Sequence, residues 1–158
     1  MVGSIGKVIT SLFGKKSDKD VKFILPLVKE TLAEQEKIKN ISNDALRNNS
    51  DIFRKEIKDF IKPEEDKIKQ LKIDAEKVGL PVLEKEAIFK EVDQLSKTID
   101  NKIEEVLNKI LPRAFANIRE TSRRFKENNE ISVLATEMDK ELAGRKDNID
   151  IDGDQAIY

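Results

Sequence analysis

Residues 88–110, IFKEVDQLSKTIDNKIEEVLNKI, decide the fold class of this chain. Apolar residues recur in this stretch at steps of four and three, and the positions between them are mostly Lys, Glu, Asp and Gln. An α-helix gathers positions at this spacing on one side, so the stretch predicts a helix that packs lengthwise against another, as in a coiled coil. The repeating positions are Ile88, Val92, Leu95, Ile99, Ile103, Val106 and Ile110.

The partner helix is predicted in the residues just before this stretch. Ser42 is suited to cap a helix start, and an apolar stripe follows it past Pro63, which we expect to kink the helix without ending it. Gly79, Leu80 and Pro81 then predict a sharp reversal. The sequence therefore predicts an antiparallel, coiled-coil-like hairpin over residues 62–110. The stripe consists of Leu46, Phe53, Ile57, Phe60, Ile68, Leu71, Ala75 and Val78.

The rest of the chain is predicted to be helical up to its last residues. Ser17 and Asp18 are expected to cap a second helix that ends near Asn40, and Pro26 implies a kink or a late start near Leu25. Leu111 and Pro112 are expected to begin another helix, because proline is tolerated in the first turn. The fold class is therefore all-α and elongated.

After residue 127 the pattern changes. A short helix is expected over Ile131, Leu134, Met138 and Leu142, closed by Gly144. In the last stretch isoleucines alternate with aspartates, and Asp152 with Gly153 is a turn pair, which predicts the start of a short β-hairpin.

Composition excludes several kinds of catalytic site. The 158 residues contain no cysteine and no histidine, so neither thiolate chemistry nor a histidine-based triad can be built. The sequence contains two Gly-Lys pairs, and neither has the glycine spacing of a phosphate-binding loop, so no nucleotide site is predicted. No catalytic residue is predicted either. With 30 basic and 31 acidic residues the charge is balanced, which argues against a nucleic-acid partner.

One short stretch resembles a metal site. Asn148, Asp150, Asp152 and Gly153 resemble the opening of a calcium loop, but the acid that such a loop needs at its twelfth position lies beyond Tyr158. We interpret the stretch as an acidic turn or linker and predict no metal site.

The first residues predict an amphipathic helix with lysines outside its apolar stripe. Lys7 interrupts the apolar run, so the segment is neither a signal peptide nor a membrane span. Three interpretations remain open: a helix that lies on an anionic membrane, a helix that docks on a protein, and an ordinary terminal helix that covers a core. The stripe is Ile5, Val8, Ile9, Leu12 and Phe13, and the lysines are Lys7, Lys15, Lys16 and Lys19.

A second basic cluster lies in the predicted helix after residue 111. It could contact phosphate or an acidic partner, but pairing with Glu120, Glu127 and Glu130 is the interpretation that we favour. The cluster consists of Arg113, Arg119, Arg123, Arg124 and Lys126.

Three stretches resemble, in this order, the beginning of the SecA family of protein-export motors. They are GKVITSLFGKKSDKDVK (6–22), ISNDALRNNSDIFRKEI (41–57) and LPRAFANIRETSRR (111–124). The third is the most specific, because an Ala-Phe-Ala, Arg-Glu and Ser-Arg series at fixed spacing is hard to reach by helix propensity alone. Asn49, Ser50 and Thr121 depart from the family pattern, and residues 62–110 and 125–158 look like insertions.

The resemblance implies a division of the chain and roles for some residues. It implies N-terminal helices over 1–61, an inserted hairpin over 62–110, a family helix over 111–127 and a second insertion over 128–158. The stripe and lysines of the first helix would dock on the membrane and the channel. Packing against the ATPase domain would fall to Phe53, Phe115, Ile118, Arg119 and Arg123.

The resemblance also implies partners and cofactors. The parent motor would bind ATP and magnesium, and its partners would be a SecY-type membrane channel, an anionic phospholipid surface and preproteins. The chain itself, as an N-terminal fragment, would hold no cofactor and perform no catalysis. Its location would be cytoplasmic and peripheral, on the inner face of the bacterial cell membrane, and its exposed apolar surface predicts a homo-oligomer. The rival interpretations are a stand-alone coiled-coil adaptor and a peripheral lipid-binding helical protein.

Overall fold

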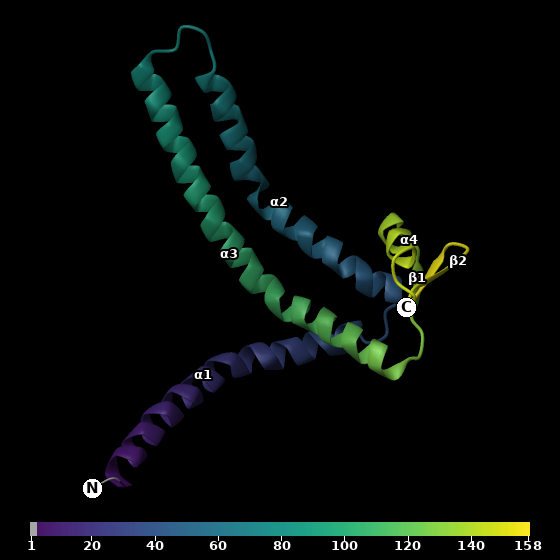
Figure 1. The fold of residues 1–158 in the computed structure, drawn as a ribbon. Helices are drawn as coiled ribbons and strands as arrows, with labels where there is room; N and C mark the ends of the chain where they lie inside the picture. Colours follow the sequence, from purple (N-terminus) through teal and green to yellow (C-terminus); the bar gives the residue numbers. More distant parts are fainter. Residues whose placement is uncertain (1–2) are drawn as a thin grey trace.

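The computed structural model describes the backbone of residues 3–158 and the side chains from Asp18 onward. Three long helices, α1 (Gly3–Ile38), α2 (Asn43–Ala75) and α3 (Val82–Glu127), make up most of the chain. A small module of strands and the short helix α4 (Glu137–Ala143) follows them. Figure 1 shows an elongated molecule in which α2 and α3 run side by side, α1 crosses the base of α3, and the module lies beside the start of α2. The predicted elongated helical fold is confirmed.

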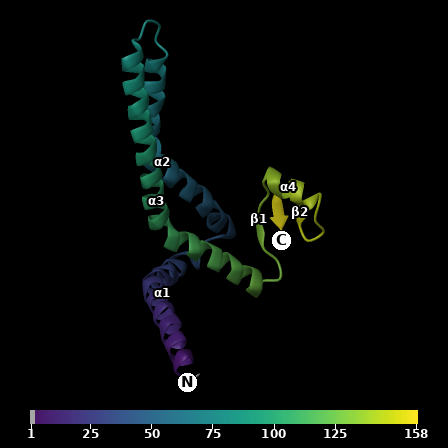
Figure 2. The same ribbon diagram turned by 60° about the vertical axis from the view of Figure 1, so that its left-hand side comes forward.

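The predicted antiparallel hairpin is formed by α2 and α3, which pack along each other in both views (Figures 1 and 2). Its reversal is at Gly79, whose φ of +87° lies in the left-handed region that glycine adopts without a Cβ penalty. Ile61 and Ala75 of α2 and Val92, Val106 and Ile110 of α3 are buried between the helices. The apolar repeat therefore forms the seam of the hairpin, as its spacing predicts.

Three ion pairs join the two arms of the hairpin. Arg113 reaches Glu56 at 2.7 Å, Lys102 reaches Glu64 at 2.5 Å, and Lys67 reaches Glu91 at 2.7 Å. The Lys102 hydrogen bond lowers the pKa of the Glu64 carboxyl. These pairs fix the register of the arms more than they stabilise them, because partly exposed ion pairs contribute little free energy.

Two helix starts predicted within what are continuous long helices are wrong. Helix α1 continues through Ser17 and Asp18 and past Pro26, and α3 continues through Leu111 and Pro112. The side chain of Pro112 is buried, and α3 packs against the rest of the protein on both sides of it. Tertiary packing of this kind sustains a helix across a proline that would end it in isolation. The prediction that the helix does not end at Pro63 is confirmed, because α2 continues past it.

The C-terminal module contains the strands β1 (Ser132–Leu134), β2 (Asp150–Asp152) and β3 (Gln155–Ile157) in the spatial order β1-β3-β2, all antiparallel. The predicted hairpin is present, with Gly153 at φ +59° in the turn between β2 and β3. The predicted helix start at Ile131 is wrong. Ile131 and Val133 alternate as buried residues of an extended segment, and α4 begins only after Thr136, which caps it through a capping box with Asp139.

Candidate docking and packing surfaces

The basic cluster of α3 is centred on a buried carboxylate. Glu120 is fully buried, and its oxygens accept hydrogen bonds from Arg123 at 2.7 and 2.9 Å, from Arg124 at 3.0 Å and from Gln35 of α1 at 3.3 Å. The Arg123 contacts, helped by Arg124 and Gln35, lower the pKa of Glu120 from 4.5 to about 2 against the opposing effect of burial. The carboxylate therefore stays charged and holds two guanidinium groups in place.

Arg124, which Glu120 holds in place, binds the segment that connects α1 to α2. Its guanidinium donates to the backbone oxygens of Ile38, Lys39 and Ile41 at 3.4, 3.3 and 2.8 Å, and to the Asn43 side chain at 2.7 Å. The carbonyls at the end of a helix have no partner within the helix, so a buried cation there satisfies them and matches the helix dipole. Arg124 is thus a structural residue that joins three helices.

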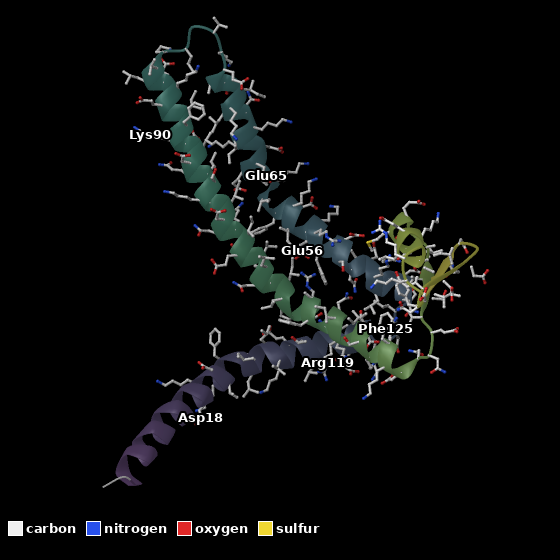
Figure 3. All side chains as sticks on the ribbon, in the orientation of Figure 1. Asp18, Glu56, Glu65, Lys90, Arg119 and Phe125 are labelled. Carbon is white, nitrogen blue, oxygen red and sulfur yellow. The ribbon has the colours of Figure 1, made fainter. Side chains whose placement is uncertain are left out.

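The other basic residues of the cluster are engaged or exposed. Arg119 donates to Gln35 at 2.7 Å where α3 crosses α1, and Figure 3 shows it at that crossing. The guanidinium carbon of Arg113 lies 5.4 Å from the centroid of the Phe53 ring, and the same guanidinium group pairs with Glu56. Lys126 is exposed. Arg123 also pairs with Glu127. Internal pairing with Glu120 and Glu127 is therefore confirmed, whereas Glu130 forms no ion pair among the described side chains.

The outward face of α3 is apolar. Phe115 is 48% exposed and Ile118 62%, although they are large hydrophobic side chains. Of the residues predicted to pack against an ATPase domain, Phe115, Ile118 and Arg119 are therefore exposed on α3, whereas Phe53 is half-buried between the arms of the hairpin.

A cleft of about 320 Å³ opens where the C-terminal module meets α2 and α3. Its apolar wall includes Leu46, Phe125, Ile131, Val133 and Met138. Figure 3 shows Phe125 on the side of α3 that faces the module, and its ring meets that of Tyr158 edge-on at 6.4 Å. The module and the helices therefore meet at an interface that their side chains fill only in part.

A second buried carboxylate holds the module in place, and sequence reasoning missed it. Asp139 is fully buried and accepts two hydrogen bonds from Arg47 of α2, at 2.7 and 2.8 Å, and others from Tyr158 and Thr136. The Arg47 fork holds the pKa of Asp139 far below its usual range, and burial and the bond to Asp139 raise the pKa of the Tyr158 phenol. The Thr136-x-x-Asp139 spacing signals the helix cap, but nothing local signals Arg47, which lies 92 residues away.

Helix α2 also covers the outer edge of strand β1. Asp44 accepts from the backbone nitrogen of Leu134 at 2.7 Å, and Asn43 donates to the backbone oxygen of Ser132 at 3.1 Å. Side chains at the start of α2 therefore satisfy the main-chain groups that an edge strand would otherwise present to solvent.

Helix α1 leaves the rest of the molecule along its N-terminal half (Figures 1 and 2). Phe23 is 85% exposed, and a stripe of half-exposed residues continues beside it: Val21, Ile24, Leu25, Val28 and Leu32. Of the predicted docking residues Lys19 is exposed, and the side chains of Ile5, Lys7, Val8, Ile9, Leu12, Phe13, Lys15 and Lys16 lie outside the described ones. None of the described helices has an apolar stretch long enough to cross a bilayer.

The residues of the calcium-loop pattern do not gather into a metal site. Asp150 and Asp152 lie on strand β2, and in the part of the chain that the structure describes no three acidic side chains converge as metal ligands do.

Comparisons with known proteins identify the family. The model of the SecA DEAD-like domain matches residues 9–136. The protein translocase subunit SecA of Porphyromonas gingivalis is 41% identical over 150 residues, which are 95% of this chain and 13% of the relative. The SecA subunits of Azobacteroides pseudotrichonymphae and Flavobacterium psychrophilum are 37% and 36% identical, and each match covers 98% of this chain and 14% of the relative. No solved structure matches the chain.

The matched relatives share the long hairpin region with this chain, since their alignments run through nearly all of its residues. The chain spans only 13 to 14% of the length of these relatives. The family model covers most of the chain, and several relatives exceed a third identity over almost all of it. The chain therefore belongs to the SecA family, in the region of its DEAD-like domain.

Proposed function

We propose that this chain is the N-terminal region of a SecA export motor, in which α1 docks on the membrane and its channel and the outward face of α3 packs against the ATPase domain. The observation that carries the first role is that α1 extends away from the hairpin along its N-terminal half, and that Phe23 and an apolar stripe over residues 21–32, which follow that half, are exposed. A helix that covered only its own core would bury this stripe.

The charges of α1 favour an anionic surface as the target. The sequence places Lys7, Lys15, Lys16 and Lys19 along the same helix, and each lysine near an anionic membrane adds about 1 kcal/mol of attraction. The apolar stripe would enter the interface between headgroups and acyl chains while the lysines contact the headgroups.

The exposed face of α3 supports the packing role. Phe115 and Ile118 project from a helix whose opposite side is fixed by the Glu120 network, so they are held on a rigid support. Their exposure agrees with a surface that another domain of a longer protein covers. The parent motor would bind ATP and magnesium in that domain, and preproteins and a SecY-type channel would be partners of the whole motor. It would work at the inner face of the cell membrane.

Vesicle sedimentation tests the docking role. The chain should bind vesicles of phosphatidylglycerol and phosphatidylethanolamine and bind phosphatidylcholine vesicles at least tenfold more weakly. The variant K7E/K15E/K16E/K19E should lose most of the binding to the anionic vesicles, since it reverses the charge of the docking lysines.

A matched control reverses four exposed lysines of the hairpin, K58E/K62E/K69E/K72E. This variant carries the same change in net charge and should keep its binding to the anionic vesicles. Equal loss in both variants would mean that net charge alone drives the attraction, and α1 would then have no special role.

A further inference from the structure

The three-stranded sheet of the C-terminal module has one covered edge and one open edge. The outer edge of β1 is covered by Asn43, Asp44 and Arg47 of α2. Strand β2 lies at the other edge, and its residues Asp150, Ile151 and Asp152 are exposed. The sheet can therefore grow only beside β2.

The register shows which main-chain groups point out of this edge. Ile131 and Tyr158 exchange two backbone hydrogen bonds, and Ala135 donates to Asp154. Between these two pairs, Ala156 is the residue of β3 whose main-chain groups point towards β1. The odd-numbered residues Gln155 and Ile157 then bond to Asp152 and Asp150 of β2, because hydrogen-bonded pairs alternate along an antiparallel ladder. The N–H and C=O of Ile151 consequently point away from β3, and no described residue bonds to them.

The side chains along this edge define what could pair with it. Asp150 and Asp152 lie on one face of the sheet, and Ile151 lies on the other face with Val133 and Ala156. Residues 147–154, DNIDIDGD, contain four aspartates and no basic residue, whereas Arg145 and Lys146 precede them. Neither Asp150 nor Asp152 forms an ion pair among the described residues, and Arg145 is paired with Glu141. A strand placed beside β2 would meet negative charge on one face and an apolar residue on the other.

We propose that a strand with basic, apolar and basic residues in succession, from the part of the full-length protein outside this chain, adds to the open edge of β2. Its apolar residue lies opposite Ile151, and its two basic residues lie opposite Asp150 and Asp152. Opposite charges directly across a strand pair stabilise it, whereas like charges destabilise it.

Charge rules out a second copy as the occupant. Two β2 edges placed together would bring Asp150 and Asp152 of one copy against those of the other, which is a known way in which sheet edges avoid pairing with themselves. The basic-apolar-basic runs within this chain are at 37–39, 67–69 and 124–126. They belong to α1 with its C-terminal turn, to α2 and to α3, so they are already used.

The shortness of the edge favours a tethered strand over a free peptide. Ile151 offers one donor and one acceptor, which gives too little binding energy to offset the entropy lost when a separate molecule associates. A segment of the same polypeptide has a high effective concentration and loses much less. The relatives are long enough to supply it, because this chain spans 13 to 14% of their length.

Hydrogen exchange resolved to single amides tests the proposal in the full-length protein and in the 158-residue chain. The Ile151 amide should exchange at least tenfold more slowly in the full-length protein. The amides of Asp150 and Asp152, which bond to β3 in either case, should differ much less. In the full-length variant D150K/D152K the Ile151 amide should return to within about twofold of its rate in the shorter chain.

The control variant D93K/E104K makes the same charge change on the exposed side of α3 and should leave the Ile151 amide protected in the full-length protein. Equal Ile151 exchange in the two proteins would overturn the proposal. Protection that survives D150K/D152K would show that the edge is covered by something other than a basic strand. Protection that grows with protein concentration would show pairing between copies. None of these outcomes depends on vesicle binding by α1, so this proposal and the docking role fail independently.

Discussion

Glu120 is the residue on which the junction of the three long helices depends. It is fully buried, yet it is charged, since Arg123, Arg124 and Gln35 supply the hydrogen bonds that water would otherwise provide. Breaking a buried ion pair by neutralising one partner typically costs several kcal/mol, because the remaining charge stays buried without compensation.

The junction should therefore be sensitive to acid. The pKa of Glu120 falls from 4.5 to about 2 on folding, so its contribution is complete above about pH 4.5 and is lost as the pH falls towards 2. A shift of this size corresponds to about 3 kcal/mol of the free energy of unfolding at neutral pH. E120Q should lower that free energy by about this amount at pH 7 and by much less at pH 2, as measured by urea unfolding.

E127Q is the control for this prediction. Glu127 pairs with Arg123 at the surface, where an ion pair contributes at most about 1 kcal/mol. A deficit of E120Q that was the same at pH 7 and pH 2 would show that shape, and not charge, is what Glu120 provides.

The sequence predicts some elements well because their signals are local and long. The hairpin of α2 and α3 is confirmed because its apolar repeat runs over three heptads and a glycine marks its reversal. Strand β1 was missed because three residues carry too little periodicity, and it is held in place by Asn43 and Asp44 from α2. The helix starts predicted at Ser17 and Pro112 were wrong, because α1 and α3 continue through these residues despite their local cap and proline signals.

The candidate site could be predicted only in part for a similar reason. The pairing of Arg123 with Glu120 follows from a spacing of three residues in one helix. The inward direction of Arg124 does not, because the backbone oxygens that it reaches lie 83 to 86 residues earlier in the chain. Such contacts depend on the tertiary fold, which no local pattern contains.

The seam of the hairpin gives a prediction at the scale of the element. Val106 is 2% exposed and its neighbour Leu107 is 47% exposed on the same helix. V106A should lower the free energy of unfolding by about 1 to 3 kcal/mol through lost burial and a cavity. L107A should change it by about 0.5 kcal/mol, as is usual for an exposed position.

Thermal unfolding followed by circular dichroism at 222 nm measures both variants. If L107A proved as destabilising as V106A, the outer side of α3 would be covered in solution, and the arms would not pack as described.

At the scale of the whole molecule, the chain is built from rigid helices that bury few of their large apolar side chains. Phe115 and Ile118 on α3, the stripe on α1, and Val78, Val82 and Leu83 at the tip of the hairpin are all exposed. A protein with so much exposed apolar surface tends to associate.

We expect self-association of the chain in solution, driven by the α3 face. In analytical ultracentrifugation the variant F115S/I118S should shift the chain towards the monomer. The variant V82S/L83S, which removes two exposed apolar side chains at the tip, should not. A monomeric unsubstituted chain, or a shift caused only by the tip variant, would count against the α3 face as the packing surface.

The reversal at Gly79 has a consequence for how this protein can evolve. Apart from Gly79 and its two chain neighbours, no described heavy atom lies within 4 Å of the point where a Cβ of Gly79 would stand, and the tip residues Val78, Val82 and Leu83 are exposed. Matched insertions or deletions of seven residues in each arm would keep the seam in phase and change the reach by about 10 Å, while Arg124 and Glu120 stayed in place. Length is thus a property that lineages can alter in whole heptads at little cost to the anchored end.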